Sequence, residues 1–484
     1  MGSASDRTTA SRRALLKGAV LATGVAAAPA GAALAQANPE VDVIVVGAGM
    51  SGLAAARALR AKGLSVLVLE ARGRVGGRTK PGTIAGVKID LGGMWVGPTQ
   101  TRALALGEAF GLERYPSYIE GRNVTEIGGV VRNGAGDSPI AEDAAMADFV
   151  GMAMKIDSMS KQVPLDAPWT AADAAKWDAT TLASWIEANS TTPAARTMLD
   201  AIISAVMSAD ASQTSLLYFL FYVHSGDDLT TLAGMGEGAQ KWLYRGGLNQ
   251  IAFRMAAELG PAVRLNAPVR RIAQTAAGVE VTSDAGVFRA RRAIVAIPPA
   301  LAGRIDYSPA LPAMRDALSQ RLPMGSVIKF WVAFDKPFWR AKGLNGMVIT
   351  DRSPVGLYCD VSPDAAGPGL IAGFFEGPHA VAWGQKSAAE RKAQVVGDLT
   401  RLLGPEAAHP IDYVDNDWPS EEWSRGCYVG VAPPGVISVF GEALRQPVGR
   451  IHWAGTETSS EWCGYVEGAI RAGERAAAEV TAAG

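Results

Sequence analysis

The feature that most constrains the fold is the stretch VDVIVVGAGMSG, residues 41–52. Its β-branched run predicts a buried parallel strand, and the three glycines that follow have G-x-G-x-x-G spacing before a predicted helix over residues 51–62. In this arrangement Gly47 permits a tight turn, Gly49 lets the backbone approach a pyrophosphate, and Gly52 lets the helix pack against the strand. The stretch therefore predicts a dinucleotide-binding βαβ unit, with a glycine-rich turn in another α/β protein as the alternative.

A second predicted strand, residues 65–70, ends at an acid. The carboxylate of Glu70 can accept hydrogen bonds from ribose hydroxyls and would repel a 2′-phosphate. The segment ARGRVGGRT, residues 71–79, follows at once and supplies cations at Arg72 and Arg78 together with two more glycines. Two dinucleotide contacts in one continuous stretch favour an extended FAD over NAD.

The segment IDLGGMWVGPTQ, residues 89–100, repeats the pattern of paired glycines before an aromatic residue. Gly93 would let the backbone lie against a flat ring, and Trp95 follows two residues later. On local evidence a structural turn and a flavin contact both remain open for this segment.

A third signature lies near the C-terminus. Residues 450–453 predict a short strand, which leads into a loop containing Gly455 and Glu457. A helix with a face of small residues is predicted to start near Tyr465. The backbone amide of Val466 at its N-terminus can point toward developing negative charge, such as the edge of a reduced flavin.

Composition excludes several classes of function. The 46 Lys and Arg balance 47 Asp and Glu, which leaves a formal charge of −1, so no basic field favours nucleic acid as a partner. The three cysteines lack disulfide or metal-ligand spacing, and the four histidines form no cluster, so a transition-metal site is not expected. At 484 residues the chain is long enough for two or three domains. Any redox chemistry must then come from an organic cofactor.

The first forty residues predict an export signal. SRRALLKG, residues 11–18, puts paired arginines before a stretch rich in Ala and Gly, and ALAQA, residues 33–37, offers small-residue cleavage sites. This pattern resembles a twin-arginine signal and predicts a periplasmic protein that is exported folded. The alternative is a disordered leader or an expression-tag remnant on a cytoplasmic protein. Pro29 and the small side chains around it argue against a helix that spans a membrane.

Taken together, these residues resemble the flavin-containing amine oxidase family, and most closely the monoamine oxidases. The resemblance runs from Val41 to the C-terminus and is densest in VGAGMSGLAAARAL, LEARGRVGGRT, DLGGMWVGPTQ, AIPPALAGRIDYSPALP, LPMGSVIKF, GCYVG and GYVEGAIRAGERAA. It implies an α/β fold with a Rossmann-like FAD-binding domain and an interleaved α+β substrate domain. The implied FAD domain is residues 41–97, 236–299 and 426–484, and the implied substrate domain is residues 98–235 and 300–425.

Local patterns agree with this division. Residues 263–299 alternate between apolar and polar side chains like β-hairpins before the run AIVAI returns as a buried strand. Residues 143–200 are rich in Ala, Met and Leu at helical spacing. The chain ends at Gly484, directly after a predicted helix, so no C-terminal membrane anchor is expected.

The resemblance also implies roles for single residues. Lys329 matches the lysine that holds a water at flavin N5, and Tyr428 and Tyr465 match the two aromatic walls of the substrate cage. Cys427 matches the cysteine that carries an 8α-thioether to the flavin, and both a covalent and a non-covalent flavin remain open. The predicted cofactor-binding residues are Gly47, Gly49, Gly52, Glu70, Arg72, Arg78, Gly93, Val269, Cys427, Gly455, Glu457 and Val466. The predicted substrate-pocket residues are Trp95, Gln240 and Phe374, with Ala233 near a position that shapes the cavity.

The predicted reaction is FAD-dependent oxidative deamination of a small apolar primary amine, aryl-alkyl or alicyclic, with O₂ reduced to H₂O₂. An ammonium has no lone pair to assist the transfer, so the neutral amine must react, although its pKa is about 10. Alternatives are a polyamine or an L-amino acid oxidase on the same fold, in which Arg196 or Asp227 would recognise a second charge. A more distant alternative is a flavoprotein binding module without turnover. A homodimer is possible on this interpretation.

Overall fold

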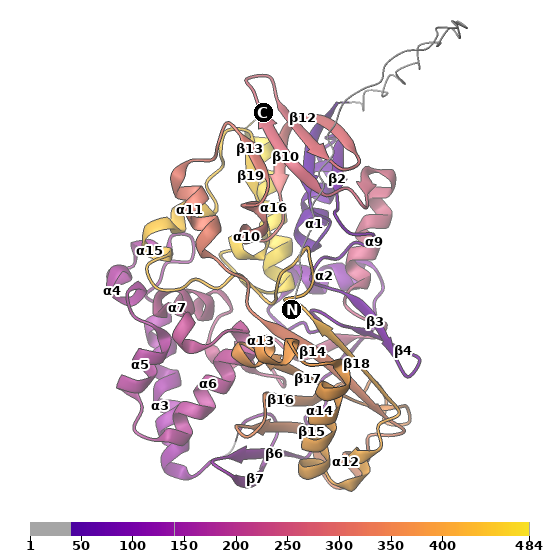
Figure 1. Cartoon of the computed structure of the whole chain (residues 1–484), viewed down its shortest axis with the longest axis vertical. Helices are drawn as coiled ribbons and strands as arrows, with labels where there is room; N and C mark the ends of the chain where they lie inside the picture. Colours follow the sequence, from indigo (N-terminus) through magenta and orange to yellow (C-terminus); the bar gives the residue numbers. More distant parts are fainter. Residues whose placement is uncertain (1–39, 140, 484) are drawn as a thin grey trace, which may run out of the picture. The chain divides into compact units, whose positions relative to one another are not determined.

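Two β-sheets organise the chain. The computed structural model describes residues 40–139 and 141–483, and the predicted export signal lies outside them. The first sheet has eight strands in the order β13-β10-β11-β12-β1-β2-β9, with β19 also paired to β12 (Figure 1). Its strands are β1 (Val41–Val46), β2 (Val66–Leu69), β9 (Val263–Arg264), β10 (Val269–Gln274), β11 (Val279–Ser283), β12 (Gly286–Val295), β13 (Asp306–Ser308) and β19 (Ile451–Trp453).

The predicted dinucleotide-binding unit lies in the middle of this sheet. Strand β1 pairs in parallel with β2 on one side and with β12 on the other, and α1 (Met50–Ala61) follows it directly. A Cβ built on Gly52 would lie 1.9 Å from the carbonyl oxygen of Gly47, which shows how closely α1 approaches the turn. At Gly473 of α16 (Val466–Ala482), a Cβ would lie 2.1 Å from the carbonyl oxygen of Ser51. Glycine is therefore required at both positions, as predicted for Gly52.

Strand β12 differs from its prediction. The sequence pattern places a hairpin strand and a separate return strand AIVAI, but one continuous strand, Gly286–Val295, does both. Its first half pairs antiparallel with β11, and its second half, from Ala290, pairs in parallel with β1. The strand is long enough to leave the hairpin and enter the centre of the sheet without a turn, and periodicity alone does not show this.

The second sheet has seven strands in the order β18-β14-β17-β16-β15-β6-β7 (Figure 1). They are β6 (Arg122–Ile127), β7 (Val130–Ala135), β14 (Val327–Phe334), β15 (Leu344–Thr350), β16 (Val355–Asp360), β17 (Gly369–Glu376) and β18 (Asp412–Asp417). Two short ribbons complete the strands: β3 (Pro81–Ile84) with β4 (Val87–Asp90), and β5 (Arg114–Pro116) with β8 (Trp242–Tyr244). Every residue of β14 and β17 is buried, so both faces of the sheet are covered along these two neighbouring strands.

Helices cover both sheets. A helical layer built around the buried α7 lies beside the second sheet, and its members α3 to α6 span the region predicted as helical (Figure 1). Within the described ranges, no helix has both the length and the apolar character needed to cross a bilayer. The remaining helices are α2 (Thr101–Ala109), α3 (Asp143–Ser160), α4 (Ala174–Asp178), α5 (Leu182–Asn189), α6 (Pro193–Met207), α7 (Leu216–Ser225), α8 (Leu229–Ala233), α9 (Gln250–Leu259), α10 (Pro299–Ala302), α11 (Ala313–Arg321), α12 (Phe338–Ala341), α13 (Pro378–Gly384), α14 (Ala388–Leu403) and α15 (Ile437–Phe440).

The segments of the two predicted domains interleave in one compact unit. Residues 41–97, 236–299 and 426–484 supply every strand of the first sheet except β13, which falls in the predicted substrate segment 300–425. Strand β13 pairs in parallel with β10 and so extends the first sheet at its edge. The second sheet is built from residues 98–235 and 300–425 only.

Candidate active site

A large internal cavity of about 840 Å³ connects the two sheets. One end is lined by the turn after β1, including Gly49, and by Glu70 at the end of β2. The other end is lined by Phe374 of β17 and by Tyr428 and Tyr465 from C-terminal segments. A cavity that is continuous from a nucleotide-binding turn to an aromatic chamber is suited to an extended dinucleotide with a substrate beside its reactive ring.

The predicted ribose-binding acid is held at the nucleotide end. The carboxylate of Glu70 accepts hydrogen bonds from the backbone N–H groups of Ala48, at 2.7 Å, and Arg72, at 2.9 Å. Glu70 is buried yet lines the cavity, so its position is fixed by the turn before any ligand binds. Arg72 also lines the cavity, and its buried Nε has no hydrogen-bond partner among the described residues. This nitrogen lies 4.0 Å from a carboxylate oxygen of Glu421, too far for a hydrogen bond. A buried donor that makes no hydrogen bond beside this turn fits an acceptor-rich ligand such as FAD.

The glycines shape this end of the cavity in two ways. Gly47 and Gly52 form the turn behind the lining, whereas Gly49, Gly93 and Gly455 line the cavity themselves. Gly455 has φ +101° and its N–H donates to the hydroxyl oxygen of Ser51 at 2.9 Å, which ties the third signature to the first. The three nucleotide signatures of the sequence therefore meet at one place.

An ion pair joins two predicted cofactor residues. The guanidinium of Arg78 donates to both carboxylate oxygens of Glu457, at 2.6 and 3.0 Å, and to the carbonyl oxygen of Tyr428 at 2.6 Å. Arg78 lines the cavity, while Glu457 lies behind it and also accepts from the N–H of Gly430 at 3.2 Å. Glu457 thus orients Arg78, and Arg78 in turn holds the backbone of the segment that carries Tyr428.

Lys329 reaches the cavity from the centre of β14. Its Nζ donates to the carbonyl oxygen of Gly92 at 2.7 Å and lies 5.3 Å from the ring of Trp331 and 5.8 Å from the ring of Phe374. Burial lowers the pKa of Lys329 to about 7, although the negative charge of Asp90 opposes this shift. The ammonium can therefore lose or regain a proton close to neutral pH.

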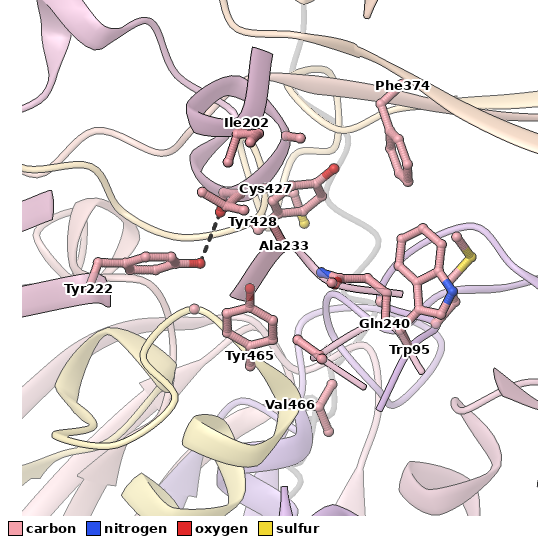
Figure 2. Close-up of a pocket in the computed structure, with 18 of the residues that line it drawn as sticks. Trp95, Ile202, Tyr222, Ala233, Gln240, Phe374, Cys427, Tyr428, Tyr465 and Val466 are labelled. Atoms are coloured by element: carbon pink, nitrogen blue, oxygen red, sulfur yellow. Dashed lines mark hydrogen bonds between the residues drawn. The ribbon is translucent and has the colours of Figure 1, made fainter. Parts of the chain in front are cut away.

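Two tyrosines reach into the same chamber, as Figure 2 shows. Tyr465 immediately precedes α16, its hydroxyl donates to the carbonyl oxygen of Leu232 at 3.3 Å, and its ring packs edge-on against Trp462 at 5.0 Å. The ring of Tyr428 packs edge-on against Phe374 with the centroids 6.1 Å apart. Both tyrosines line the cavity, and each ring is held by an edge-on contact with another aromatic ring.

The remaining predicted pocket residues complete the chamber. Trp95 lies against Phe374 with ring centroids 6.0 Å apart, and Ala233 contributes only a methyl group (Figure 2). Gln240 donates from Nε2 to the carbonyl oxygen of Leu232 at 2.9 Å, and its buried Oε1 has no hydrogen-bond partner among the described residues. That oxygen is an acceptor in a chamber whose other polar groups include tyrosine hydroxyls and Lys329.

Cys427 precedes Tyr428 and lines the cavity as a buried free thiol. Burial raises the pKa of Cys427 to about 12, against the opposing effect of the Arg78 charge. The thiol is therefore protonated at neutral pH in the protein alone.

Sequence reasoning missed one group beside this chamber. The hydroxyl of Tyr428 donates to Oε1 of Glu376 at 3.0 Å, and Glu376 is buried at the end of β17. Strand alternation was the signal that could have found it, because Glu376 follows Phe374 by two residues and so faces the same side of the sheet. Without that signal, Glu376 at the end of the apolar run GLIAGFF is interpreted as the exposed residue where the strand reaches solvent.

Some predicted residues lie outside the lining. Val269 starts β10 in the first sheet and is not among the residues that line the cavity. Neither alternative charge-recognition residue reaches it: Arg196 donates to the Ser190 hydroxyl, and the exposed Asp227 pairs with Lys161 at 3.0 Å. The full set of predicted residues outside the lining is Gly47, Gly52, Val269 and Glu457.

Two curated relatives match nearly the whole chain. One from Mycobacterium tuberculosis, which carries the name of a flavin-containing monoamine oxidase, is 41% identical over 91% of this chain and 97% of its own length. An L-amino acid dehydrogenase from Synechocystis is 40% identical over 92% of this chain and 96% of its own length.

Two solved structures share the fold at similar identity. Cyclohexylamine oxidase from Brevibacterium oxydans has a TM-score of 0.88 at 36% identity, and putrescine oxidase bound to putrescine has a TM-score of 0.88 at 35% identity. Each match covers 92% of this chain and 99% of the other. Residues 50–481 match the family model of the flavin-containing amine oxidoreductases. As predicted from its motifs, the chain belongs to this family of FAD-dependent amine-oxidising enzymes.

Proposed function

We propose that this enzyme oxidises small apolar primary amines, aryl-alkyl or alicyclic, and releases an aldehyde or ketone, ammonia and H₂O₂. The observation that carries the proposal is the chemistry of the chamber between Tyr428 and Tyr465. The side chains labelled there in Figure 2 are aromatic, aliphatic, thiol or amide, and none carries a charge. Burying a compact apolar body in such a chamber contributes about 25 cal/mol per Å² of surface.

When bound, FAD accepts the hydride equivalent from the α-carbon of the amine. The protein's own groups bind and orient the substrate: Tyr428 and Tyr465 confine the amine, and Oε1 of Gln240 is available to accept a hydrogen bond from its N–H group. Lys329, held at the Gly92 carbonyl, supplies the group near the reacting centre that can exchange a proton at Nζ. We further propose that O₂ is the electron acceptor.

Recognition of a second charge is disfavoured. A diamine or an amino acid needs a carboxylate or a cation in the chamber, because an unpaired buried charge costs several kcal/mol. The three lining carboxylates away from the nucleotide end are already bound: Asp137 to backbone amides at 2.7 and 2.9 Å, Asp157 to the Leu229 amide, and Glu237 to Lys241. This distribution supports monoamines over the substrates named for putrescine oxidase and L-amino acid dehydrogenase.

The test is a substrate panel measured by anaerobic bleaching of the flavin and by peroxide release in air. We expect benzylamine and cyclohexylamine to outrun putrescine, spermidine and L-amino acids in kcat/KM. A higher kcat/KM for putrescine would show a diamine oxidase, and a higher value for an L-amino acid would show an amino acid oxidase. A flavin that no compound in the panel bleaches would mean a binding module.

Finer points follow as proposals. We propose that the site residues act as assigned from the sequence, that residues 98–235 and 300–425 form the substrate-binding part, and that twin-arginine export places the enzyme in the periplasm. Detection in a periplasmic fraction that disappears when the two arginines of residues 11–18 are replaced by lysines tests the export. Light scattering of the purified protein tests whether it is a homodimer.

A further inference from the structure

A buried carboxyl group lies directly behind one wall of the chamber. Oε1 of Glu376 accepts a hydrogen bond from the Tyr428 hydroxyl at 3.0 Å, and Glu376 is 6% exposed. On β17, Glu376 faces the same side as Phe374, and across the sheet it pairs with Val327 while Phe374 pairs with Lys329. Glu376 is therefore hydrogen-bonded to a ring that lines the chamber, and it is not itself among the lining residues.

No cation compensates this carboxyl group. Within residues 40–139 and 141–483, no Lys, Arg or His forms an ion pair with Glu376. The titratable groups that face it are Tyr428 from the segment after β18, Cys359 from β16 and Lys329, which lies two register positions away on β14. The Ser208 hydroxyl at the end of α6 lies beside the Tyr428 hydroxyl. Burial raises the pKa of Cys359 to about 12, so this thiol stays neutral where an acid titrates.

Burial raises the pKa of Glu376 to about 8, and the hydrogen bond from Tyr428 partly offsets the rise. At neutral pH the carboxyl is mostly protonated and the chamber beside it carries no net charge from this group. Above about pH 8 a carboxylate forms behind Tyr428 without an ion-pair partner among the described residues, while burial keeps the nearby Lys329 mostly neutral at that pH.

We propose that Glu376 is a positioning residue for amine oxidation: its protonated carboxyl keeps the chamber uncharged, so that the substrate is held as a neutral amine, and its ionisation limits turnover at high pH. The inference rests on the proposed function, in which Tyr428 is a wall of the substrate chamber. It adds a group that acts through Tyr428 rather than touching the substrate.

The proton balance gives this inference a distinct signature. A complex of protonated Glu376 with a neutral amine holds as many protons as a complex of the carboxylate with an ammonium. Only the complex with the neutral amine has a lone pair on nitrogen. A carboxylate behind Tyr428 favours the complex with the ammonium by charge attraction. Flavin reduction at limiting amine should therefore rise tenfold per pH unit up to about pH 8 and then level off, because each gain in neutral amine is offset by a loss of protonated Glu376.

The experiment is anaerobic stopped-flow reduction of the holoenzyme by benzylamine and by cyclohexylamine between pH 6 and about pH 10. For the wild type we expect the same break near pH 8 with both amines, although their own pKa values differ. For Glu376→Gln, which keeps an oxygen that accepts from Tyr428 but cannot ionise, we expect the rate to rise up to the pKa of the amine. The ratio of its reduction rate at pH 9 to its rate at pH 7 should be about ten times the same ratio for the wild type.

Two further variants complete the test. Glu126→Gln removes a buried carboxylate of β6 that binds Thr350 and Arg401 outside the cavity, and it should keep the wild-type break. Tyr428→Phe keeps the ring but removes the hydrogen bond that lowers the pKa of Glu376, so its break should move to higher pH. If Glu376→Gln does not fold, the shared wild-type break and its shift in Tyr428→Phe carry the test.

Different results would overturn different claims. A wild-type profile that follows the pKa of each amine without a break near pH 8, or a break that persists in Glu376→Gln, would refute the role of Glu376 while leaving the proposed function intact. No flavin reduction by any monoamine at any pH would refute the proposed function, and the role of Glu376 with it.

Discussion

Gly52→Ala is the substitution whose effect the structure defines most sharply. The added Cβ would lie 1.9 Å from the carbonyl oxygen of Gly47 and 3.3 Å from the Cβ of Ala296. Real Cβ atoms do not come within 3.0 Å of such neighbours, so α1 must move away from the strand by about 1 Å. The obstacle is backbone on both sides, and no side chain can rotate to relieve it.

The expected cost follows from this geometry. Overpacking of a well-packed site costs about 1–3 kcal/mol, and a clash between two backbone segments belongs at the upper end of that range. We therefore expect Gly52→Ala to lower the free energy of unfolding by about 3 kcal/mol. The shift also displaces the start of α1, where Met50 and Ser51 line the nucleotide end, so FAD occupancy should fall with it.

The matched control is Gly397→Ala in α14. A Cβ at Gly397 meets nothing within 4 Å, so alanine should stabilise the helix by about 0.5–1 kcal/mol and leave FAD bound. Urea unfolding gives the stability of each variant, and the ratio of flavin to protein absorbance gives the occupancy. If Gly52→Ala matches Gly397→Ala in both measurements, the argument from close packing of α1 is wrong.

Four further predictions concern residues that line the cavity. Lys329→Met should retain FAD but lose most of the rate of either flavin reduction or reoxidation, measured separately by stopped flow; unchanged rates would remove Lys329 from the site. Because burial lowers the pKa of Lys329 from 10.5 to about 7, the unfolded chain binds a proton between these values that the folded chain does not, so the stability of the wild type relative to Lys329→Met should rise with pH across that window. A covalent flavin on Cys427 should stay with the pellet on acid precipitation and move to the supernatant in Cys427→Ala, whereas a yellow wild-type supernatant means no bond. Tyr465→Leu should lower kcat/KM for every amine by about 10- to 100-fold with FAD still bound, and an unchanged value would show that Tyr465 is packing only.

The nucleotide end was predictable because steric requirements there are local. The spacing of Gly47, Gly49 and Gly52 follows from a turn and a helix that are adjacent in the chain, and the structure has both within one residue of the predicted bounds. The carboxylate of Glu70 was also predictable, since it ends the next strand of the same unit. The aromatic chamber was predicted only from the resemblance of the chain to a known family. No sequence pattern near Tyr428 or Tyr465 indicates that the two side chains lie together.

The remaining features depend on contacts between distant segments. Glu376 acquires its setting only when β17 brings it against Tyr428, 52 residues away along the chain. Strand β12 runs through two sheet environments because β11 and β19 pair in succession along one edge of it, while β1 pairs along the other edge from Ala290 onward. Its sequence alternates apolar and charged residues in the first half and is apolar only at the end. Ion pairing between Arg78 and Glu457 likewise joins residues 379 apart in the sequence.

The two perturbed groups at the chamber, Lys329 and Glu376, lie on the neighbouring strands β14 and β17 and belong to pairs two positions apart in their register. Burial acts on them in opposite senses: it lowers the pKa of the lysine to about 7 and raises the pKa of the acid to about 8. Between these values the lysine is largely deprotonated and the acid largely protonated, so the walls carry least charge when the pH is slightly above neutral. A neutral amine needs such a chamber, because any fixed charge would either hold it as an ammonium or repel the ammonium from which it forms. The low polarity on which we base the proposed preference for monoamines thus also shifts the pKa values of the two ionisable groups at the chamber.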